Sequence, residues 1–260
     1  MAMTVSVLMM VLATGGSAVS QPGGLVSVSL TSDRSVYHVG DAVTLTLTVT
    51  NTDDKPLFGY MALRPYLPRA FKNSTLLYCR DEVCLEFLAE MPGIEESDMQ
   101  INPMTLEPGR AHRSEFVVAY NPKTHSMVLD APGDYEFRWV TWAIHNRRGI
   151  APLARGEERS ASAFVRVLPV PPSELAAYDY YVAHKLAELA QYDQEYFRYS
   201  DELRQAAHAM LTRFPDSIYA DAVRIGFKKL LERRVRRGQA TDEDRAALDD
   251  LRARAANGRN

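Results

Sequence analysis

The segment from Ala42 to Asn51 places the strongest constraint on how this chain can fold. Its apolar and hydroxyl side chains alternate without exception: Val43, Leu45, Leu47 and Val49 against Thr44, Thr46, Thr48 and Thr50. Successive side chains of a β-strand point to opposite faces, so one face of this segment is apolar and the other is a row of hydroxyls. Most of these residues are β-branched, which suits a pleated surface. The segment is therefore predicted to be a half-buried strand of an antiparallel sheet.

Further short extended segments occur on both sides of this strand, separated by Gly- and Pro-containing turns. They are predicted at residues 25–31, 57–63, 76–88, 114–120, 135–144 and 160–167. In the segment that follows Gly133, the side chains of Tyr135, Phe137 and Trp139 share one face and are expected in the core. About eight short strands with no helical period among them predict an all-β sandwich with Greek-key connections.

Three motifs in this region resemble a known family. SVYHVGDAVTLTLTVTNTDDKPL, LEPG and PGDYEFRW are similar to the immunoglobulin-like modules of secreted bacterial proteins. The resemblance implies an immunoglobulin-like β-sandwich over residues 24–168, without the Cys…Trp…Cys spacing of antibody domains. It implies no particular activity, because sandwich modules serve many functions.

The hydrophobic period changes after a Pro-rich linker at residues 169–172. Helices are predicted from here to residue 256, the first with Ser173 as its N-cap. Its expected apolar stripe is Leu175, Tyr178, Val182, Leu186 and Leu189. A second stripe comprises Tyr192, Tyr196, Tyr199, Leu203, Ala207, Met210 and Phe214. Pro215 and Asp216 are expected to separate it from a third stripe, which comprises Tyr219, Val223, Phe227 and Leu230.

Gly238 is expected to end the third helix, and Thr241 with Asp244 to open a last one through Leu248 and Leu251. The segment LTRFPDSIYADAVRIGFKKLLER resembles a tetratricopeptide-type helical hairpin. Residues 173–256 are therefore expected to form a small all-α domain. They cover at most one and a half such repeats, too few to stand alone, so the helices should pack on the sandwich or on another chain.

Residues 1–20 have the pattern of an export signal. An apolar run from Val5 to Ala13 precedes small residues that end at Ser20. The run is too short to span a membrane as a helix. It departs from the usual signal pattern in one respect, because no Lys or Arg precedes it. The alternatives are an uncleaved anchor and an apolar tail. We expect a periplasmic or secreted protein, which contacts the membrane only if this segment is retained.

The chain contains two cysteines, Cys79 and Cys84, in the sequence YCRDEVCLEF. Their spacing fits two strands joined by a hairpin, with the sulfur atoms facing across it. In an oxidising compartment these cysteines should form a disulfide, whereas in a reducing one they would be free thiols. Two cysteines alone supply too few ligands for a metal site.

No pattern in the sequence indicates catalysis. The motifs G-x-S-x-G and H-E-x-x-H do not occur. His184 and Glu188 are four residues apart and could hold a metal on one helical face, but a solvated pair is the simpler interpretation. Glu95, Glu96 and Asp98 lack the spacing of a calcium loop. We therefore expect no enzyme activity, cofactor or metal.

Charge gives no sign of nucleic-acid binding. The formal net charge is −3, whereas nucleic-acid-binding proteins are normally basic. A run of basic residues between Arg224 and Arg237 is expected at a helix end, where cations complement the helix dipole. A solvated helix face explains this run without an anionic ligand.

The best candidate for a binding surface follows from the strand at residues 135–144. If Tyr135, Phe137 and Trp139 face the core, the alternate residues face outward. This candidate partner-binding set comprises Val140, Trp142, Ile144, His145, Arg147 and Arg148. Outward Trp and Arg residues often dominate binding energy at interfaces. Two alternatives stay open, because the helices or a loop could cover this face, or a carbohydrate could stack on Trp142.

These features together predict an exported, non-enzymatic docking protein of a bacterial envelope or exterior. Its partner would be another envelope protein. The alternative is an accessory or inhibitor module that binds carbohydrate or a protease.

Overall fold

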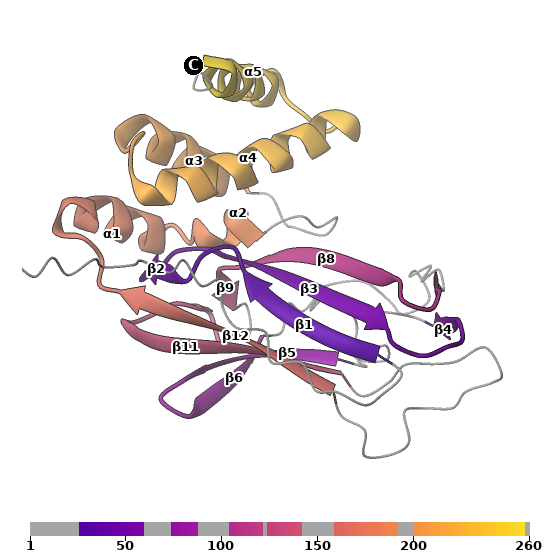
Figure 1. Cartoon of the computed structure of the whole chain (residues 1–260). Helices are drawn as coiled ribbons and strands as arrows, with labels where there is room; N and C mark the ends of the chain where they lie inside the picture. The colour runs from indigo at the N-terminus through magenta and orange to yellow at the C-terminus, as the bar shows by residue number, and fades with distance from the viewer. Residues whose placement is uncertain are drawn as a thin grey trace, which may run out of the picture.

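The computed structural model describes residues 26–59, 74–87, 104–121, 124–141, 159–191 and 200–257. Strands occupy the first part of the chain and helices the second, and the helices stack on one end of the strand layers (Figure 1). The predicted order, an all-β sandwich followed by a small all-α region, is confirmed.

One layer is a three-stranded antiparallel sheet of β1 (Val26–Ser32), β3 (Val43–Asn51) and β8 (Ala111–Val118). β3 is its central strand and is buried at every second residue, as its alternation predicts. The apolar side chains of β3 are at most 2% exposed, and Thr44 to Thr50 lie half-buried on the other face.

The other layer is a five-stranded sheet. Its order is β2 (Val36–His38), β12 (Arg159–Leu168), β11 (Gly133–Thr141), β5 (Ser74–Arg80) and β6 (Val83–Phe87). The core lies between the two layers, and Tyr135, Phe137 and Trp139 are buried in it, as predicted. Short pairs join β4 (Leu57–Gly59) to β7 (Met104–Leu106), and β9 (Tyr120–Asn121) to β10 (Ser126–Met127).

The strand order is that of an immunoglobulin-like sandwich. β2 pairs in parallel with β12, whereas the other pairings are antiparallel among the described residues. The chain therefore crosses between layers after β1, and the first and last segments of the sandwich become neighbours. The sequence did not predict β2, because three residues are too few to show a period.

The helical region contains the turn η3 (Pro172–Glu174) and five helices: α1 (Leu175–Ala183), α2 (Ala187–Gln191), α3 (Asp201–Arg213), α4 (Ile218–Arg236) and α5 (Asp242–Asn257). The predicted stripes of α4 and α5 are buried. Gly238 ends α4 with φ 68°, and Thr241 and Asp244 cap α5 reciprocally. The N-cap of α4 is Ser217, whose hydroxyl accepts a hydrogen bond from the Tyr219 N–H.

The first predicted helix was wrong in two respects. Ser173 lies inside the η3 turn and is not the N-cap of the first helix. The helix also breaks after Ala183, where Lys185 has φ 52°, and the chain resumes as α2. Two members of the predicted stripe, Leu175 and Val182 of α1, are 50% and 41% exposed. The structure describes only part of the second predicted stripe. Ala207 and Met210 of α3 are buried, and residues 192–199 lie outside the described ranges.

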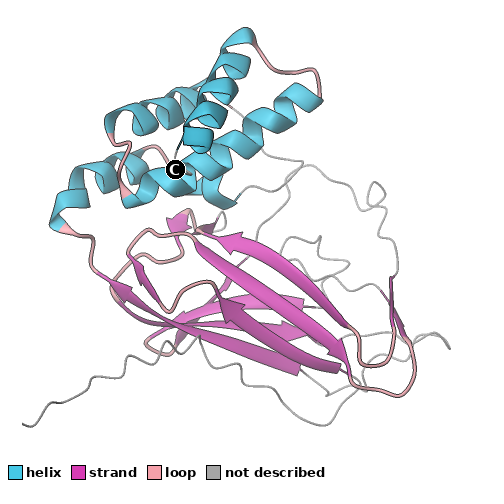
Figure 2. Ribbon diagram, turned by 45° about the horizontal axis from the view of Figure 1, so that its top comes forward, coloured by secondary structure: helices cyan, strands magenta, loops and turns pink. Residues whose placement is uncertain are grey.

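The helices share a core with the end of the sandwich (Figure 2). Ala119, Tyr120 and Met127 from the strands pack with the buried residues of all five helices. Gln191 Oε1, at the end of α2, accepts hydrogen bonds from the Ala119 and Tyr120 N–H groups at 2.9 and 2.7 Å. The expected packing of the helices on the sandwich is confirmed. Within the described ranges, no helix combines the length and apolar character needed to cross a membrane.

Candidate docking surface

The structure describes one member of the predicted partner-binding set. Val140 points away from the core on β11, but it is only 6% exposed, so its expected exposure was wrong. β11 is the central strand of its sheet, and Val140 lies between Thr75 of β5 and Ser160 of β12. Trp142, Ile144, His145, Arg147 and Arg148 lie outside the described residues.

The outward face of the five-stranded sheet carries a different group of accessible residues. One row across the strands runs from Phe164 through Glu136 and Cys79 to Cys84. Phe164 is 50% exposed, at a part of β12 beyond its short pairing with β2. Phe is one of the residue types enriched at protein interfaces, so we take this ring as the candidate contact.

The hairpin of β5 and β6 forms one side of this face. Cys79 and Cys84 are directly opposite each other and form a disulfide, as predicted from their spacing. Asp81 and Glu82 make the two-residue turn, with φ 50° and 68°. Positive φ at both positions is the I′ geometry that matches the twist of a hairpin, although Gly and Asn adopt it more easily.

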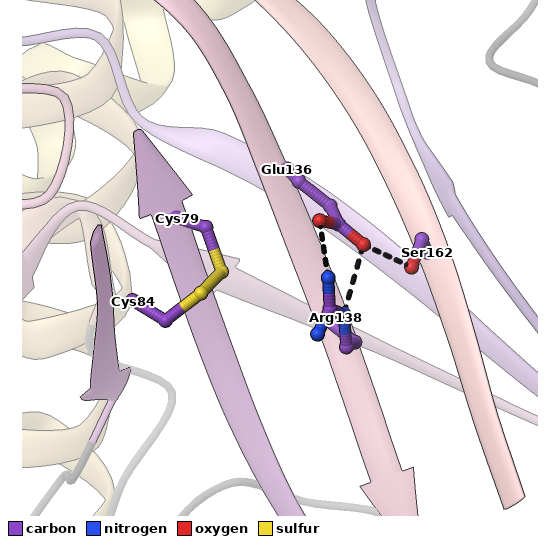
Figure 3. Close-up of a disulfide and its surroundings, with 5 residues drawn as sticks. All are labelled: Cys79, Cys84, Glu136, Arg138 and Ser162. Carbon is purple, nitrogen blue, oxygen red and sulfur yellow. Dashed lines mark hydrogen bonds and ion pairs between the residues drawn. A yellow bond between two sulfur atoms is a disulfide. The ribbon is translucent and has the colours of Figure 1, made fainter. Parts of the chain in front are cut away.

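A network of polar side chains lies in the middle of this sheet face (Figure 3). The Arg138 guanidinium donates two hydrogen bonds to the Glu136 carboxylate, at 2.9 and 2.6 Å. The Ser162 hydroxyl donates a third, at 2.6 Å. The bonds from Arg138 lower the pKa of the Glu136 carboxyl; burial opposes this and Ser162 adds to it. The carboxylate is therefore held ionised and in one orientation.

These residues line a shallow groove of about 780 Å³. Phe164 and the disulfide give it apolar surface. Its charged lining residues are Asp81, Glu82, Asp134, Glu136, Arg138 and Arg166. Four carboxylates against two guanidinium groups make the groove acidic. The groove therefore suits a ligand with an apolar group for Phe164 and cationic groups around it.

Of the carboxylate-containing metal sites considered from sequence, the described residues include only His184 and Glu188. His184 is the C-cap of α1 and Glu188 lies in α2, so the break at Lys185 separates the two. Glu95, Glu96 and Asp98 lie outside the described residues. Within the described ranges, no group of three or more His, Cys, Asp or Glu side chains could hold a metal. Near the end of the basic run, Arg234 pairs with the buried Asp244 at 2.9 Å and joins α4 to α5.

Phe164 was missed as a candidate although its strand was predicted. In SASAFVRV, Ala161, Ala163, Val165 and Val167 alternate with the other residues. If the first set faces the core, as the structure shows, Phe164 must face outward. The alternation of side chains along this strand therefore indicates the outward position of Phe164, by the same reasoning that applies to β11.

No protein-family model matches the chain, and the search of the curated proteins gives no match. Distant structural similarity covers the sandwich. The sporulation control protein Spo0M of Bacillus subtilis has 15% identity and a TM-score of 0.31, over 60% of this chain and 54% of Spo0M. The matched region therefore spans about half of Spo0M.

A CARDB domain from Pyrococcus furiosus, solved in complex with di-metal ions, has 11% identity and a TM-score of 0.28. That match covers 56% of this chain and 94% of the domain. The C-terminal domain of wzt has 12% identity and a TM-score of 0.29, over 60% of this chain and 80% of that domain. These likenesses are too weak to indicate a function.

Proposed function

We propose that this protein is an exported, non-enzymatic docking protein of a bacterial envelope or exterior. Its docking surface is the outward face of the five-stranded sheet, and its partner is another envelope protein. The observation that carries the proposal is the half-exposed Phe164 beside the groove. A partner that covers this ring would remove apolar area from water, which favours binding. The hydrogen-bonded Glu136–Arg138 pair beside the ring would then favour a partner with complementary polar groups.

Three further features support the proposal. The disulfide of the hairpin is stable in an oxidising compartment, which agrees with the signal-like residues 1–20. The resemblance of the sandwich to secreted bacterial modules, and of α3 with α4 to a tetratricopeptide-type hairpin, favours binding over catalysis. The acidic groove favours a partner segment with Lys or Arg residues.

Site-specific photo-crosslinking in cells that export the protein tests this function. A photoreactive amino acid is placed at position 164 and, as a matched control, at position 175 of α1. Phe164 and Leu175 are each 50% exposed, but only Phe164 borders the groove. We expect a protein adduct of one defined mass from position 164 and none of that mass from position 175.

The same experiment distinguishes the alternatives. Identical adducts at both positions, or no adduct at position 164, would contradict a specific docking surface there. An adduct that a glycosidase removes would assign the face to carbohydrate instead of a protein. Full-length chain in the cytoplasm with two reactive thiols would contradict export.

A further inference from the structure

A second groove, of about 450 Å³, lies where α4 crosses the end of the three-stranded sheet. It is bordered by α4, by the connections before and after β2, and by Glu115 and Val117 of β8. It shares no lining residue with the groove beside Phe164. Clefts between two packed regions are frequent positions for small-ligand sites, and this volume is within their usual range.

One wall of this groove is an apolar stripe on α4. Ile218, Ala222 and Ile225 lie on one face of the helix, and all three line the groove. The opposite stripe, which contains Tyr219 and Phe227, is already buried among the helices. Ile218 and Ile225 nevertheless remain 39% and 57% exposed. The helix therefore has a second apolar face that its own fold does not cover.

The end of the groove near the sandwich carries an excess of negative charge. Asp33 and Asp41 share a single guanidinium, that of Arg34, at 3.5 and 3.6 Å. Asp41 is only 7% exposed, and its carboxylate also accepts a hydrogen bond from the His38 N–H. Burial raises the pKa of Asp41, because the charged form loses more solvation than these two partners replace.

Other charged groups face the same space. Glu115, Asp221 and Lys229 line the groove, so its lining holds four carboxylates against two cations. Asp221 is paired with Arg224 of its own helix. The excess negative charge therefore lies at Asp33 and Asp41, which share the single Arg34 guanidinium.

Buried tyrosines form the floor beside Asp41. Tyr181 and Tyr219 stack with ring centroids 5.1 Å apart, and both line the groove. The Tyr219 hydroxyl donates to the Val39 carbonyl. The buried Tyr181 hydroxyl has no hydrogen-bond partner within the part of the chain that the structure describes. Tyr181 and Tyr219 are only 0% and 1% exposed, so their rings lie beneath the groove and Asp41 is the charged group above them.

We infer that this groove binds an organic ammonium ion with an apolar tail. The ammonium group lies at Asp41, and the tail lies along Ile218 and Ile225. The excess carboxylate explains the preference for a cation, and the uncovered α4 stripe explains the preference for a tail.

Three probes with alkyl tails of seven or eight carbons and different head groups test the inference on the whole protein. n-Octylammonium, octanoate and octyl glucoside are titrated below their micelle concentrations and followed by calorimetry. We expect octylammonium to bind at least tenfold more tightly than octanoate. Asp41→Asn keeps an oxygen that can accept from the His38 N–H, and it should weaken octylammonium binding about tenfold. The same variant should leave octyl glucoside binding within about twofold.

The tail contact has its own matched pair. For each probe that binds the wild type, Ile225→Ser should weaken the affinity about tenfold, because it removes apolar area from the groove wall. Val235→Ser changes a residue of the same helix that is 40% exposed but does not line the groove, and it should have no effect.

Equal affinity for octylammonium and octanoate would overturn the inference, as would no binding of any probe. Unchanged octylammonium binding by Asp41→Asn would overturn the position of the head group. If Asp41→Asn does not fold, Glu115→Gln on the exposed rim should give a smaller loss in the same direction, and its absence would count against the site.

Discussion

At the scale of single residues, Gly226 has the strictest requirement for its side chain. It lies where α4 meets α2, and a Cβ atom built on it would be 1.9 Å from the Leu189 carbonyl oxygen. A contact this short is with backbone, so a side-chain rotation cannot relieve it. The two helices can meet here only because position 226 has no side chain.

Gly226→Ala should therefore lower the free energy of unfolding by about 2–4 kcal/mol, since α2 and α4 must separate to accept the methyl group. Urea denaturation of the purified protein measures this change. Gly238→Ala is the control: its φ of 68° is strained for Ala, but nothing lies within 4 Å. It should cost only about 1 kcal/mol. Equal losses would mean that α2 and α4 are not in close contact.

Glu136 should give a pH dependence of known sign. Its pKa is lowered in the folded protein, chiefly by the hydrogen bonds from Arg138. The folded protein therefore binds a proton at this site less readily than the unfolded chain. The stabilisation is present above the ordinary carboxyl pKa and is lost as the pH falls through the lowered value.

Urea denaturation across pH 7 to 3 should therefore show a smaller loss of stability for Glu136→Gln than for the wild type. The neutral variant cannot take up the proton that weakens the network. A parallel loss of stability in both proteins would show that the Arg138 contact does not hold this carboxylate.

At the scale of elements, the β5–β6 hairpin is the part of the docking surface whose shape depends on a covalent bond. The disulfide joins residues five apart. Closing so small a loop stabilises the folded state by about 2 kcal/mol when treated as lost chain entropy. The turn beside it lowers stability, because Glu82 rarely adopts positive φ, whereas Asp81 adopts it more readily.

Changing both Cys79 and Cys84 to Ala should lower the free energy of unfolding by about 2 kcal/mol. Glu82→Gly should raise it by about 0.5 kcal/mol, because Gly accepts the turn geometry without strain. Glu82→Ala is the control, since it removes the carboxylate but keeps the Cβ atom, and it should give no gain. Equal effects of Gly and Ala would assign any change to charge.

Elements with a clear period were predictable, and those fixed by distant contacts were not. The alternation in β3 and the buried set of β11 follow directly from side-chain period. The Cys spacing predicted the hairpin for the same reason, because its pairing is local. The break at Lys185 was not predictable, since Leu175 and Val182 continue a helical period that only the packing of α2 against α4 interrupts.

The sequence indicated the outward face of β11 as a binding surface, which stays a prediction, but it did not indicate the groove beside Phe164. The outward face of β11 was expected to bind a partner, and the described part of the groove lies on the same sheet face. Val140 faces outward as its period indicates but is buried, and the burial of an outward side chain cannot be deduced from the period of one strand. Phe164 could have been found from the alternation of its own strand.

At the scale of the whole molecule, two cores meet at one junction. The sandwich core and the helical core are separate clusters, and partly buried Tyr178 packs against both. Gln191 satisfies two buried backbone N–H groups where β8 gives way to β9. The junction therefore depends on a polar side chain as well as on apolar packing.

Gln191→Leu should lower the free energy of unfolding by about 2–4 kcal/mol, because it leaves two buried N–H groups without an acceptor. Gln191→Glu keeps an acceptor oxygen for both groups. It should retain the protection of the Ala119 and Tyr120 amides from hydrogen exchange, whereas Gln191→Leu should lose it. Unchanged protection in Gln191→Leu would show that the helices are not joined to the sandwich through this residue.

The docking surface is tested most directly by the affinity of the partner captured at position 164. The dissociation constant of that purified partner is measured for the wild type, Phe164→Ala and Leu175→Ala. We predict that Phe164→Ala weakens binding at least tenfold, as expected for a buried aromatic anchor, and that Leu175→Ala changes it less than about twofold. Equal affinity for the wild type and Phe164→Ala would contradict a docking surface centred on this ring.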